Sequence, residues 1–306
     1  MALKVSLVTT VKNSADHVGE FLASVRAQTR MPDEIVVVDG GSTDGTLERL
    51  REAEGVILIE EPGANISRGR NLAIQAATHD VLAVSDADCV LEPAWLERLL
   101  EPIESGGDVS MGAYVPVVDG FLQACIAAVN LPSPEELDEA TFMPSARSLA
   151  FRRGAIEAAG GYPEWLDIGE DMYVNHRWRE LGLDLRLARG AVVRWRLRRG
   201  LRATWRQYFR YARGDAIAGM FPARHALRFA VYGGLAAALL LRRRPLAIVA
   251  LLAGAAYAAR PTARAVARAE APGDRAAAAA AVPALMAFLD LAKMAGYVAG
   301  LLQQRR

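Results

Sequence analysis

The sequence predicts an α/β fold with a doubly wound, mostly parallel sheet, followed by a C-terminal helical and apolar region associated with a membrane. Three observations support this prediction. Short β-rich apolar runs alternate with helical patterns as far as residue 103. Polar residues directly follow several of these runs, at the strand ends where such a sheet binds its ligands. After residue 225 the composition changes to mostly alanine and leucine.

The first hundred residues contain two kinds of periodic segment. Four β-rich apolar runs are expected to be strands, and they cover residues 4–10, 34–39, 56–60 and 80–84. Four segments are expected to be helices, and they cover residues 16–28, 47–54, 65–77 and 93–103. The run at 34–39 is apolar without interruption, which is typical of a strand buried in a parallel sheet. This βαβαβαβ order predicts a doubly wound parallel sheet.

The pattern is less regular after residue 106. A strand is expected at 111–118, and a polar, proline-containing loop at 132–138. Residues 148–151 precede a short helix at 154–159, and a Gly-Gly-Tyr-Pro turn follows it. A further helix is expected from 167 to 181, with Glu170 and Asp171 near its first turn. Acidic residues there complement the helix dipole, so capping alone is an alternative to a functional role.

The composition narrows the class of protein. A length of 306 residues suits one large domain, or one domain with an appendage. The formal net charge of +1 gives no global field for binding nucleic acid. Cys89 and Cys125 have no paired spacing, so we expect neither a disulfide framework nor a zinc site. Polar residues between 9 and 13 interrupt the first apolar run, so we expect no signal peptide and a cytoplasmic N-terminal part.

Asp86 and Asp88 follow the fourth predicted strand with one residue between them. Two carboxylates at a strand end can converge on Mg²⁺ or Mn²⁺, which proteins hold with one or two carboxylates plus substrate phosphate oxygens. An aspartate-rich turn is the alternative. Thr10 and Asp39 end the first two predicted strands in the same way. Because parallel strands end at one edge of a sheet, these side chains are expected to converge.

Six short motifs occur in order within residues 4–215. They are V-S-L-V-T-T-V-K-N at 5–13, V-V-V-D-G-G-S-T-D-G-T at 36–46, S-R-G-R-N-L-A at 67–73, S-D-A-D at 85–88, G-G-Y-P-E at 160–164 and G-E-D at 169–171. Together these motifs resemble the family 2 glycosyltransferases, which have the Rossmann-like GT-A fold. The series is specific for the family and does not identify the sugar.

The resemblance implies a donor site. Asp86 and Asp88 correspond to the carboxylates that hold the metal (Mn²⁺ or Mg²⁺) and the nucleotide sugar, with Asp88 as the direct ligand. Arg70 corresponds to the residue that holds the nucleotide, although a solvated helix face is the alternative. The expected nucleoside contacts are Thr10 and Asp39, and Gly41 and Ser42 are further residues expected to bind the nucleotide sugar. Many relatives carry a second acid where this chain has Gly40, so the resemblance leaves the choice of base open.

The resemblance also implies a base and an acceptor region. Asp171 corresponds to the general base of an inverting transfer, and Glu170 to a residue that orients Asp171 or the acceptor. Residues 207–211, Q-Y-F-R-Y, are similar to the Q-x-x-R-W signature of processive members, which lies on an interfacial helix beside acceptor and diphosphate. Tyr211 takes the place of the tryptophan, so we expect a single transfer. Trp195 and Arg210 are further members of this expected acceptor and diphosphate region.

The stretch 194–215 interleaves arginines with aromatic residues. Nucleic-acid binding is one account of such a stretch. A helix on anionic lipid is the favoured one, because an apolar tail follows. We therefore expect no nucleic-acid partner and assign residues 1–215 to a transferase domain, with 216–306 as a hydrophobic membrane region.

The tail contains three apolar stretches, at 226–241, 245–259 and 276–302. The first two would be about 23 Å long as helices, shorter than the ~30 Å hydrocarbon core. Three arginines at 242–244 would lie outside the cell if the first stretch crossed, against the positive-inside tendency. A re-entrant or tilted hairpin avoids this conflict, and a soluble alanine-rich bundle is the alternative.

The sequence thus predicts a metal-dependent inverting glycosyltransferase at the cytoplasmic face of the membrane. Its partners would be a nucleotide-sugar donor and a lipid-linked or glycan acceptor. A nucleotidyltransferase, and an inactive membrane-anchored subunit that binds sugar nucleotides, are the alternatives. The motifs do not specify the sugar, the linkage, the number of spans or the oligomeric state.

Overall fold

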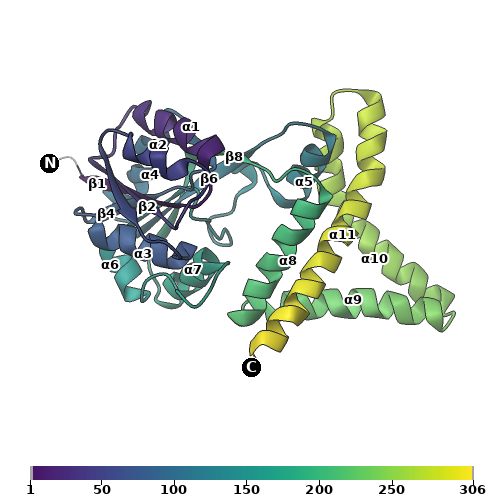
Figure 1. The fold of residues 1–306 in the computed structure, drawn as a ribbon. Coiled ribbons are helices and arrows are strands. Elements are labelled where there is room, and N and C mark those ends of the chain that lie inside the picture. Colours follow the sequence, from purple (N-terminus) through teal and green to yellow (C-terminus); the bar gives the residue numbers. More distant parts are fainter. Residues whose placement is uncertain (1–2, 305–306) are drawn as a thin grey trace. The chain divides into compact units, whose positions relative to one another are not determined.

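A computed structural model describes residues 3–304 and contains two compact units (Figure 1). The α/β unit consists of Met1–Val117 and Ser133–Arg196, and the helical unit of Val118–Pro132 and Leu197–Arg306. The predicted domain boundary lies at residue 215, whereas the structure divides the chain after Arg196 and assigns Val118–Pro132 to the helical unit. How far the functional domain extends along the chain stays a prediction.

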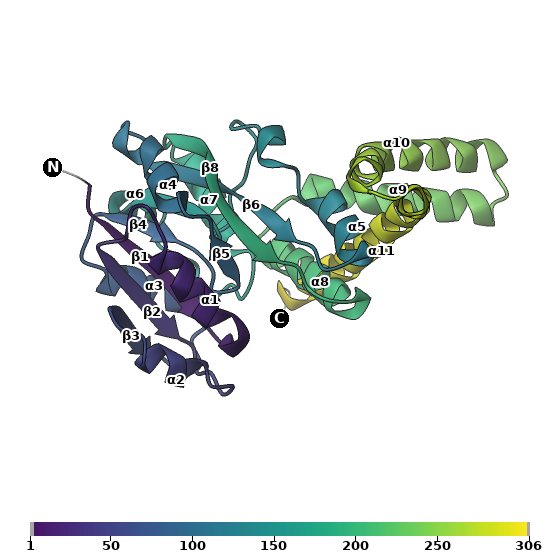
Figure 2. The same cartoon turned by 90° about the horizontal axis from the view of Figure 1, so that it is seen from above.

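The α/β unit is built on one sheet of eight strands, in the order β3-β2-β1-β4-β7-β6-β8-β5 (Figure 2). Their bounds are β1 Val5–Val11, β2 Glu34–Asp39, β3 Val56–Glu60, β4 Val81–Val84, β5 Cys89–Leu91, β6 Val109–Val117, β7 Leu149–Arg152 and β8 Leu185–Arg196. Strands β3, β2, β1 and β4 are mutually parallel, whereas β7 is antiparallel to both β4 and β6. The predicted doubly wound, mostly parallel sheet is confirmed.

Helices cover both faces of this sheet (Figure 1). They are α1 Ala15–Arg26, α2 Thr46–Arg51, α3 Ile66–Ala76, α4 Trp95–Glu104, α6 Arg153–Ala158 and α7 Glu170–Glu180, with a short 3₁₀ helix, η1, at Pro134–Glu136. On the face covered by α3, α6 and α7, Val36 and Leu82 of the sheet are fully buried in one apolar core with Trp178 of α7. Burial of these apolar surfaces is the main stabilising contribution to the unit.

The basic stretch at 194–215 is not one helix, and the predicted interfacial helix is wrong at its start. Arg194 and Arg196 belong to β8, and α8 begins only at Leu201. In β8 the side chains of Ala191, Val193 and Trp195 are buried, while Arg194 between them is exposed. This period of two is the pattern of a strand with one buried face. Because arginines occupy the exposed face, this alternation is hard to recognise as a strand in the sequence.

The helical unit contains α5 Phe121–Asn130, α8 Leu201–Ile217, α9 Pro222–Leu240, α10 Arg244–Arg268 and α11 Pro272–Gln304. Helix α11 packs closely along α8, because Gly296 and Gly300 face its backbone. A Cβ atom at Gly296 would lie 2.0 Å from the carbonyl oxygen of Phe209. Asp290 of α11 pairs with Arg228 of α9 at 2.9 Å and with Lys293, one turn along, at 3.9 Å.

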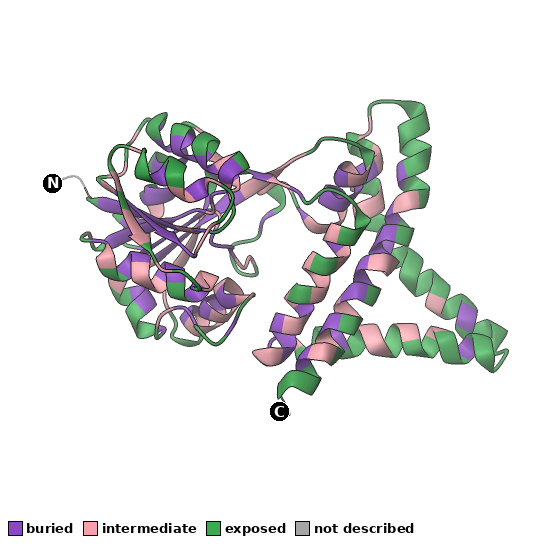
Figure 3. Ribbon diagram, in the orientation of Figure 1, coloured by how far each residue is buried: buried purple, intermediate pink, exposed green. Residues whose placement is uncertain are grey.

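Two helices of the described chain, α10 and α11, are long and apolar enough to cross a membrane by length and composition. Figure 3 shows most of α9 and α10 in the colour of exposed residues. Many of these exposed residues are large and apolar, among them Leu240, Ile248 and Leu252. Arg242 and Arg243, in the turn that joins α9 to α10, and Arg244, the first residue of α10, are also exposed.

Candidate active site

Three neighbouring strands carry polar residues at one edge of the sheet. Strands β2, β1 and β4 lie side by side and parallel, so Asp39, Thr10 and the residues after Val84 end at the same edge. Asp39 is paired in register with Val11, the residue after Thr10. The predicted convergence of these strand ends is therefore present in the structure.

Asp39 forms a compact turn with the residues that follow it. Its Oδ1 atom accepts hydrogen bonds from the backbone N–H groups of Gly41 and Ser42, at 2.9 and 2.8 Å. Gly41 has a φ of +88°, and a Cβ atom there would lie 3.2 Å from the Cα atom of Pro62. The Oδ2 atom of Asp39 is buried and has no hydrogen-bond partner within residues 3–304. A buried oxygen of this kind suits the N–H donor of a ligand.

Helix α3 lies directly against β1 because of a glycine. A Cβ atom at Gly69 would lie 2.2 Å from the Oγ1 atom of Thr10. The helix begins at a fixed point, since the side chain of Asn65 caps it by accepting a hydrogen bond from the N–H of Arg68 at 2.9 Å. Close packing and the cap together fix the position of α3. They therefore also fix Arg70, the residue after Gly69, whose guanidinium reaches Asp86.

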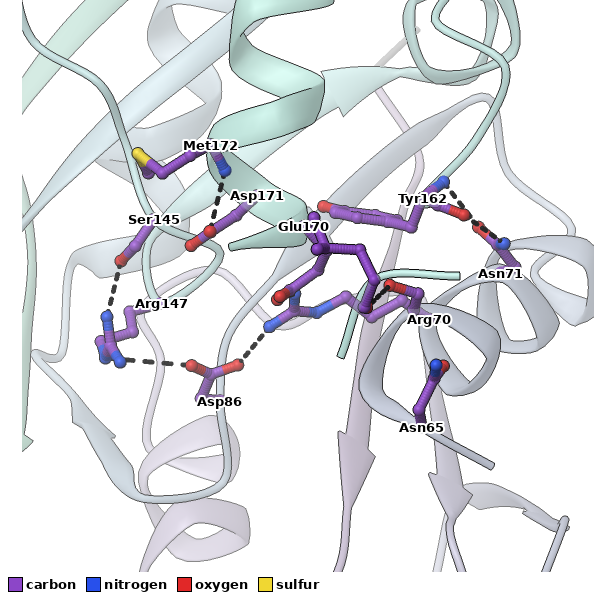
Figure 4. A network of polar contacts seen from close by, with 12 residues as sticks. Asn65, Arg70, Asn71, Asp86, Ser145, Arg147, Tyr162, Glu170, Asp171 and Met172 are labelled. Atoms are coloured by element: carbon purple, nitrogen blue, oxygen red, sulfur yellow. Dashed lines mark hydrogen bonds and ion pairs between the residues drawn. The ribbon is translucent and has the colours of Figure 1, made fainter. Parts of the chain in front are cut away.

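Arg70 connects two acidic segments that lie far apart in the sequence (Figure 4). Its side chain is only 2% exposed, and its guanidinium bonds to Asp86 Oδ1 at 2.8 Å and to the carboxylate of Glu170. The Asp86 and Glu170 charges raise the pKa of Arg70 despite its burial. The alternative of a solvated helix face is therefore wrong for Arg70.

Glu170 and Asp171 begin α7. Gly169 precedes them with a φ of +85°, in the left-handed region that favours glycine. The helix therefore starts at Glu170 and not at 167 as predicted. Burial raises the pKa of Asp171, against the opposing effect of Arg70. Burial likewise raises the pKa of Glu170 to about 7, opposed by Arg70 and reinforced by Asp171. A buried carboxylate with a raised pKa accepts protons more readily than an exposed one.

The acidic pair after β4 sits beside a second arginine. Asp86 Oδ2 lies 3.9 Å from Nε of Arg147, whose guanidinium lies 4.0 Å from the ring centroid of Trp195. No signal in the sequence identifies Arg147, because it lies in an irregular loop and no motif distinguishes it from the many other arginines. Trp195 was expected in the acceptor and diphosphate region, and it lines this part of the site from β8.

The carboxylate oxygens of Asp86 and Asp88 fit a divalent cation only if a substrate supplies further oxygen ligands. Asp86 and Asp88 are both partly exposed, and Asp88 Oδ1 accepts a weak hydrogen bond from the Cys89 thiol at 3.8 Å. Among residues 3–304 no group of three or more His, Cys, Asp or Glu side chains is arranged to hold a metal. Two carboxylates plus phosphate oxygens are a usual set for Mg²⁺, so the residues present fit such a cation.

Two other predicted acceptor residues, Arg210 and Tyr211, belong to α8 of the helical unit. Within that unit the hydroxyl of Tyr211 accepts a hydrogen bond from Gln207 at 2.8 Å. Their assignment to the acceptor and diphosphate region stays a prediction.

Two family models match the sequence: glycosyl transferase family 2 over residues 6–124 and glycosyl transferase family 21 over residues 70–305. The chain is 28% identical over 199 residues to glycosyltransferase AglE of Haloferax volcanii, covering 61% of this chain and 65% of that protein. It is 27% identical over 262 residues to the succinoglycan biosynthesis protein ExoA of Rhizobium meliloti, covering 81% and 77%. It thus spans just under two thirds of AglE.

The fold is also similar to solved structures. A mannosyltransferase from Pyrobaculum calidifontis, PcManGT, solved with GDP-Man and Mn²⁺, matches with a TM-score of 0.58 and 22% identity, over 99% of this chain and 88% of that one. The S. aureus protein TarS, solved with UDP-GlcNAc, matches with a TM-score of 0.56 and 18% identity, over 99% and 92%. At these identities the likeness concerns the fold.

Proposed function

Because this chain belongs to the family 2 glycosyltransferases, we propose that it transfers a sugar from a nucleotide-sugar donor with inversion at the anomeric carbon. The proposed acceptor is lipid-linked or a glycan. The observation that carries this proposal is the buried network in which Arg70 joins Asp86 of the strand edge to Glu170 of α7. This network links the carboxyl ends of β2, β1 and β4, which we call the donor edge, to a second pair of carboxylates, Glu170 and Asp171. Transfer to an acceptor requires groups of both kinds.

The donor half of the site would be held by the strand ends. The unpartnered Oδ2 atom of Asp39 is suited to an N–H of the nucleobase, with Thr10, Gly41 and Ser42 around it. Asp88 and Asp86 would hold Mn²⁺ or Mg²⁺, which when bound neutralises charge that develops on the departing diphosphate. The Mn²⁺ and GDP-Man in the PcManGT structure support this assignment.

Asp171 would be the general base. Burial raises its pKa, which makes its carboxylate a better acceptor for the proton of the attacking hydroxyl. A single displacement with one base inverts the configuration and needs no covalent intermediate on the enzyme. Glu170 would hold Arg70 in place, and thereby hold the carboxylate of Asp86 at the donor edge.

The helical unit would associate with the cytoplasmic face of the membrane. The exposed apolar residues of α9 and α10 support this, because contact with lipid would remove their apolar surface from water. The arginines at 242–244 suit anionic headgroups. A hairpin tilted or re-entrant from the cytoplasmic side would keep them on that side. A membrane location fits a lipid-linked acceptor.

Replacing Asp171 with Asn tests the assignment of the base. Asp171→Asn should abolish transfer, because the amide cannot accept the proton, while calorimetry should show binding of nucleotide sugar with Mn²⁺ within a few-fold of wild type. Asp167→Asn, the same change at an exposed position four residues earlier, is the control and should keep both properties. Loss of donor binding in Asp171→Asn would remove Asp171 from the role of base.

A further inference from the structure

Arg147 lies at the donor edge on the loop that precedes β7. Its side chain is 17% exposed, its Nε lies 3.9 Å from Asp86 Oδ2, and its Nη1 donates a hydrogen bond to Ser145 Oγ at 3.1 Å. Figure 4 shows Arg147 on the opposite side of Asp86 from Arg70. One carboxylate thus lies between two guanidinium groups that are both largely removed from water.

Two aromatic rings fix the position of this guanidinium. Its carbon lies 4.0 Å from the ring centroid of Trp195 on β8 and 5.8 Å from that of Tyr114 on β6. The two rings pack edge to face, with centroids 6.1 Å apart. Strands β6 and β8 are neighbours in the sheet, so rigid elements support both rings. Cation–π contacts of this kind hold a guanidinium in place and leave its N–H edge available for anions.

The charges indicate what this rigid arginine binds. Arg70 has a second carboxylate, Glu170, in addition to Asp86. Arg147 forms an ion pair with Asp86, and its charge also acts on the carboxylate of Asp171. If Asp86 shares its charge with a divalent cation, this ion pair weakens, and a desolvated guanidinium then favours another anion. A phosphate group of the donor or the acceptor would be the anion nearest to hand, because phosphate oxygens are usual partners of such a cation and of a guanidinium.

We propose that Arg147 is a phosphate-binding residue of the site, which exchanges its contact with Asp86 for a phosphate oxygen when Asp86 and Asp88 hold a cation. The inference rests on the proposed function and adds a residue to it. The phosphate belongs either to the diphosphate of the donor or to a phosphorylated acceptor. Both sources present the same oxygens to the guanidinium, and binding measurements separate them.

The test compares Arg147→Gln and Arg147→Lys with wild type by calorimetry in MnCl₂. The probes are UDP, GDP and dTDP for the donor source, with uridine, guanosine and thymidine as phosphate-free controls. Farnesyl phosphate, with farnesol as its control, represents the acceptor source. Arg147→Gln should weaken binding of the phosphate-bearing probe from one source about tenfold or more, and leave the phosphate-free control unchanged. Arg147→Lys should lose less, because it keeps the charge without the planar fork.

The matched control is Arg177→Gln, a partly exposed arginine on α7 whose ion pair with Glu180 lies within one helix. It should bind every probe as wild type does. Unchanged binding of all phosphate probes by Arg147→Gln would overturn the inference, provided that its unfolding midpoint matches wild type. If that variant does not fold, Arg147→Met, which also removes the charge, is judged by the same criterion. If wild type binds none of UDP, GDP and dTDP, the proposed function itself fails.

Discussion

Arg70 is a buried cation whose charge is balanced by two carboxylates, Asp86 in the loop that follows β4 and Glu170 at the start of α7. Buried ion pairs of this kind contribute little net stability, because the cost of removing the charges from water offsets their attraction. Breaking one by removing a single partner costs about 3–5 kcal/mol. The arrangement is better explained by the need to hold charged groups at fixed positions beside the donor edge.

Glu170 gives this network a dependence on pH. Burial raises its pKa from the ordinary value of 4.5 to about 7. Between these values the unfolded chain loses the proton while the folded protein keeps it, so the contribution of Glu170 to stability is present below pH 4.5 and lost as pH rises through 7.

Comparing Glu170→Gln with wild type measures this contribution. Gln cannot ionise, so the free energy of unfolding of wild type should fall relative to the variant as pH rises from about 4.5 to 7, by about 3 kcal/mol, and then level off. Urea unfolding at several pH values checks this. Parallel curves across that range would show that the folded protein leaves the pKa of Glu170 at its ordinary value.

Some residues of the site can be predicted from local sequence patterns, and others are brought together only by tertiary contacts. Thr10, Asp39 and Asp86 were predicted to meet because they end apolar runs, and they do lie at one edge. The contact of Arg70 with Glu170 spans 100 residues, and only the family resemblance indicated that both belong to the site. Arg147 acquires its surroundings from neighbouring β6 and β8, and no local pattern records which strands become neighbours.

At the scale of elements, the packing of α3 on β1 determines where Arg70 lies. Gly69→Ala should lower the free energy of unfolding by about 1–3 kcal/mol, because the new methyl group collides with Thr10. Combining it with Thr10→Ala, which removes the nearest atom, should cost less than the sum of the two single changes. Urea unfolding of the three variants measures both effects.

Gly154→Ala is the matched control for this prediction. Gly154 lies in helix α6, and nothing lies within 4 Å of the position of its Cβ atom. Alanine there should be neutral or slightly stabilising. If Gly69→Ala were equally neutral, the close approach of α3 to β1 could not be what positions Arg70.

The elements that the sequence predicted share a strong local signal. Strands β1 to β4 are apolar runs with turns on both sides, and the helices between them show a clear period. Strand β5 has only three residues, too few for a period. Strand β8 is rich in arginine on its exposed face, so the sequence there indicates a basic stretch and not a strand. Helix α5, in a segment that belongs to the helical unit, was missed entirely.

At the scale of the whole molecule, the chain combines two units of opposite surface character. The α/β unit buries its apolar side chains within a sheet and its covering helices, and it carries the ends of β2, β1 and β4, where we propose that the donor binds. The helical unit exposes large apolar residues along α9 and α10. Membrane association would remove that surface from water. It would also place the transferase in the same membrane plane as a lipid-linked acceptor.

The configuration of the product tests the central claim most directly. Wild-type protein with Mn²⁺ would be incubated with a panel of α-linked nucleotide sugars and a membrane extract as acceptor, and the new linkage examined by NMR. We expect a β-linked product and release of a nucleoside diphosphate, because Asp171 as the general base allows a single displacement. An α-linked product, or release of pyrophosphate in place of nucleoside diphosphate, would contradict it.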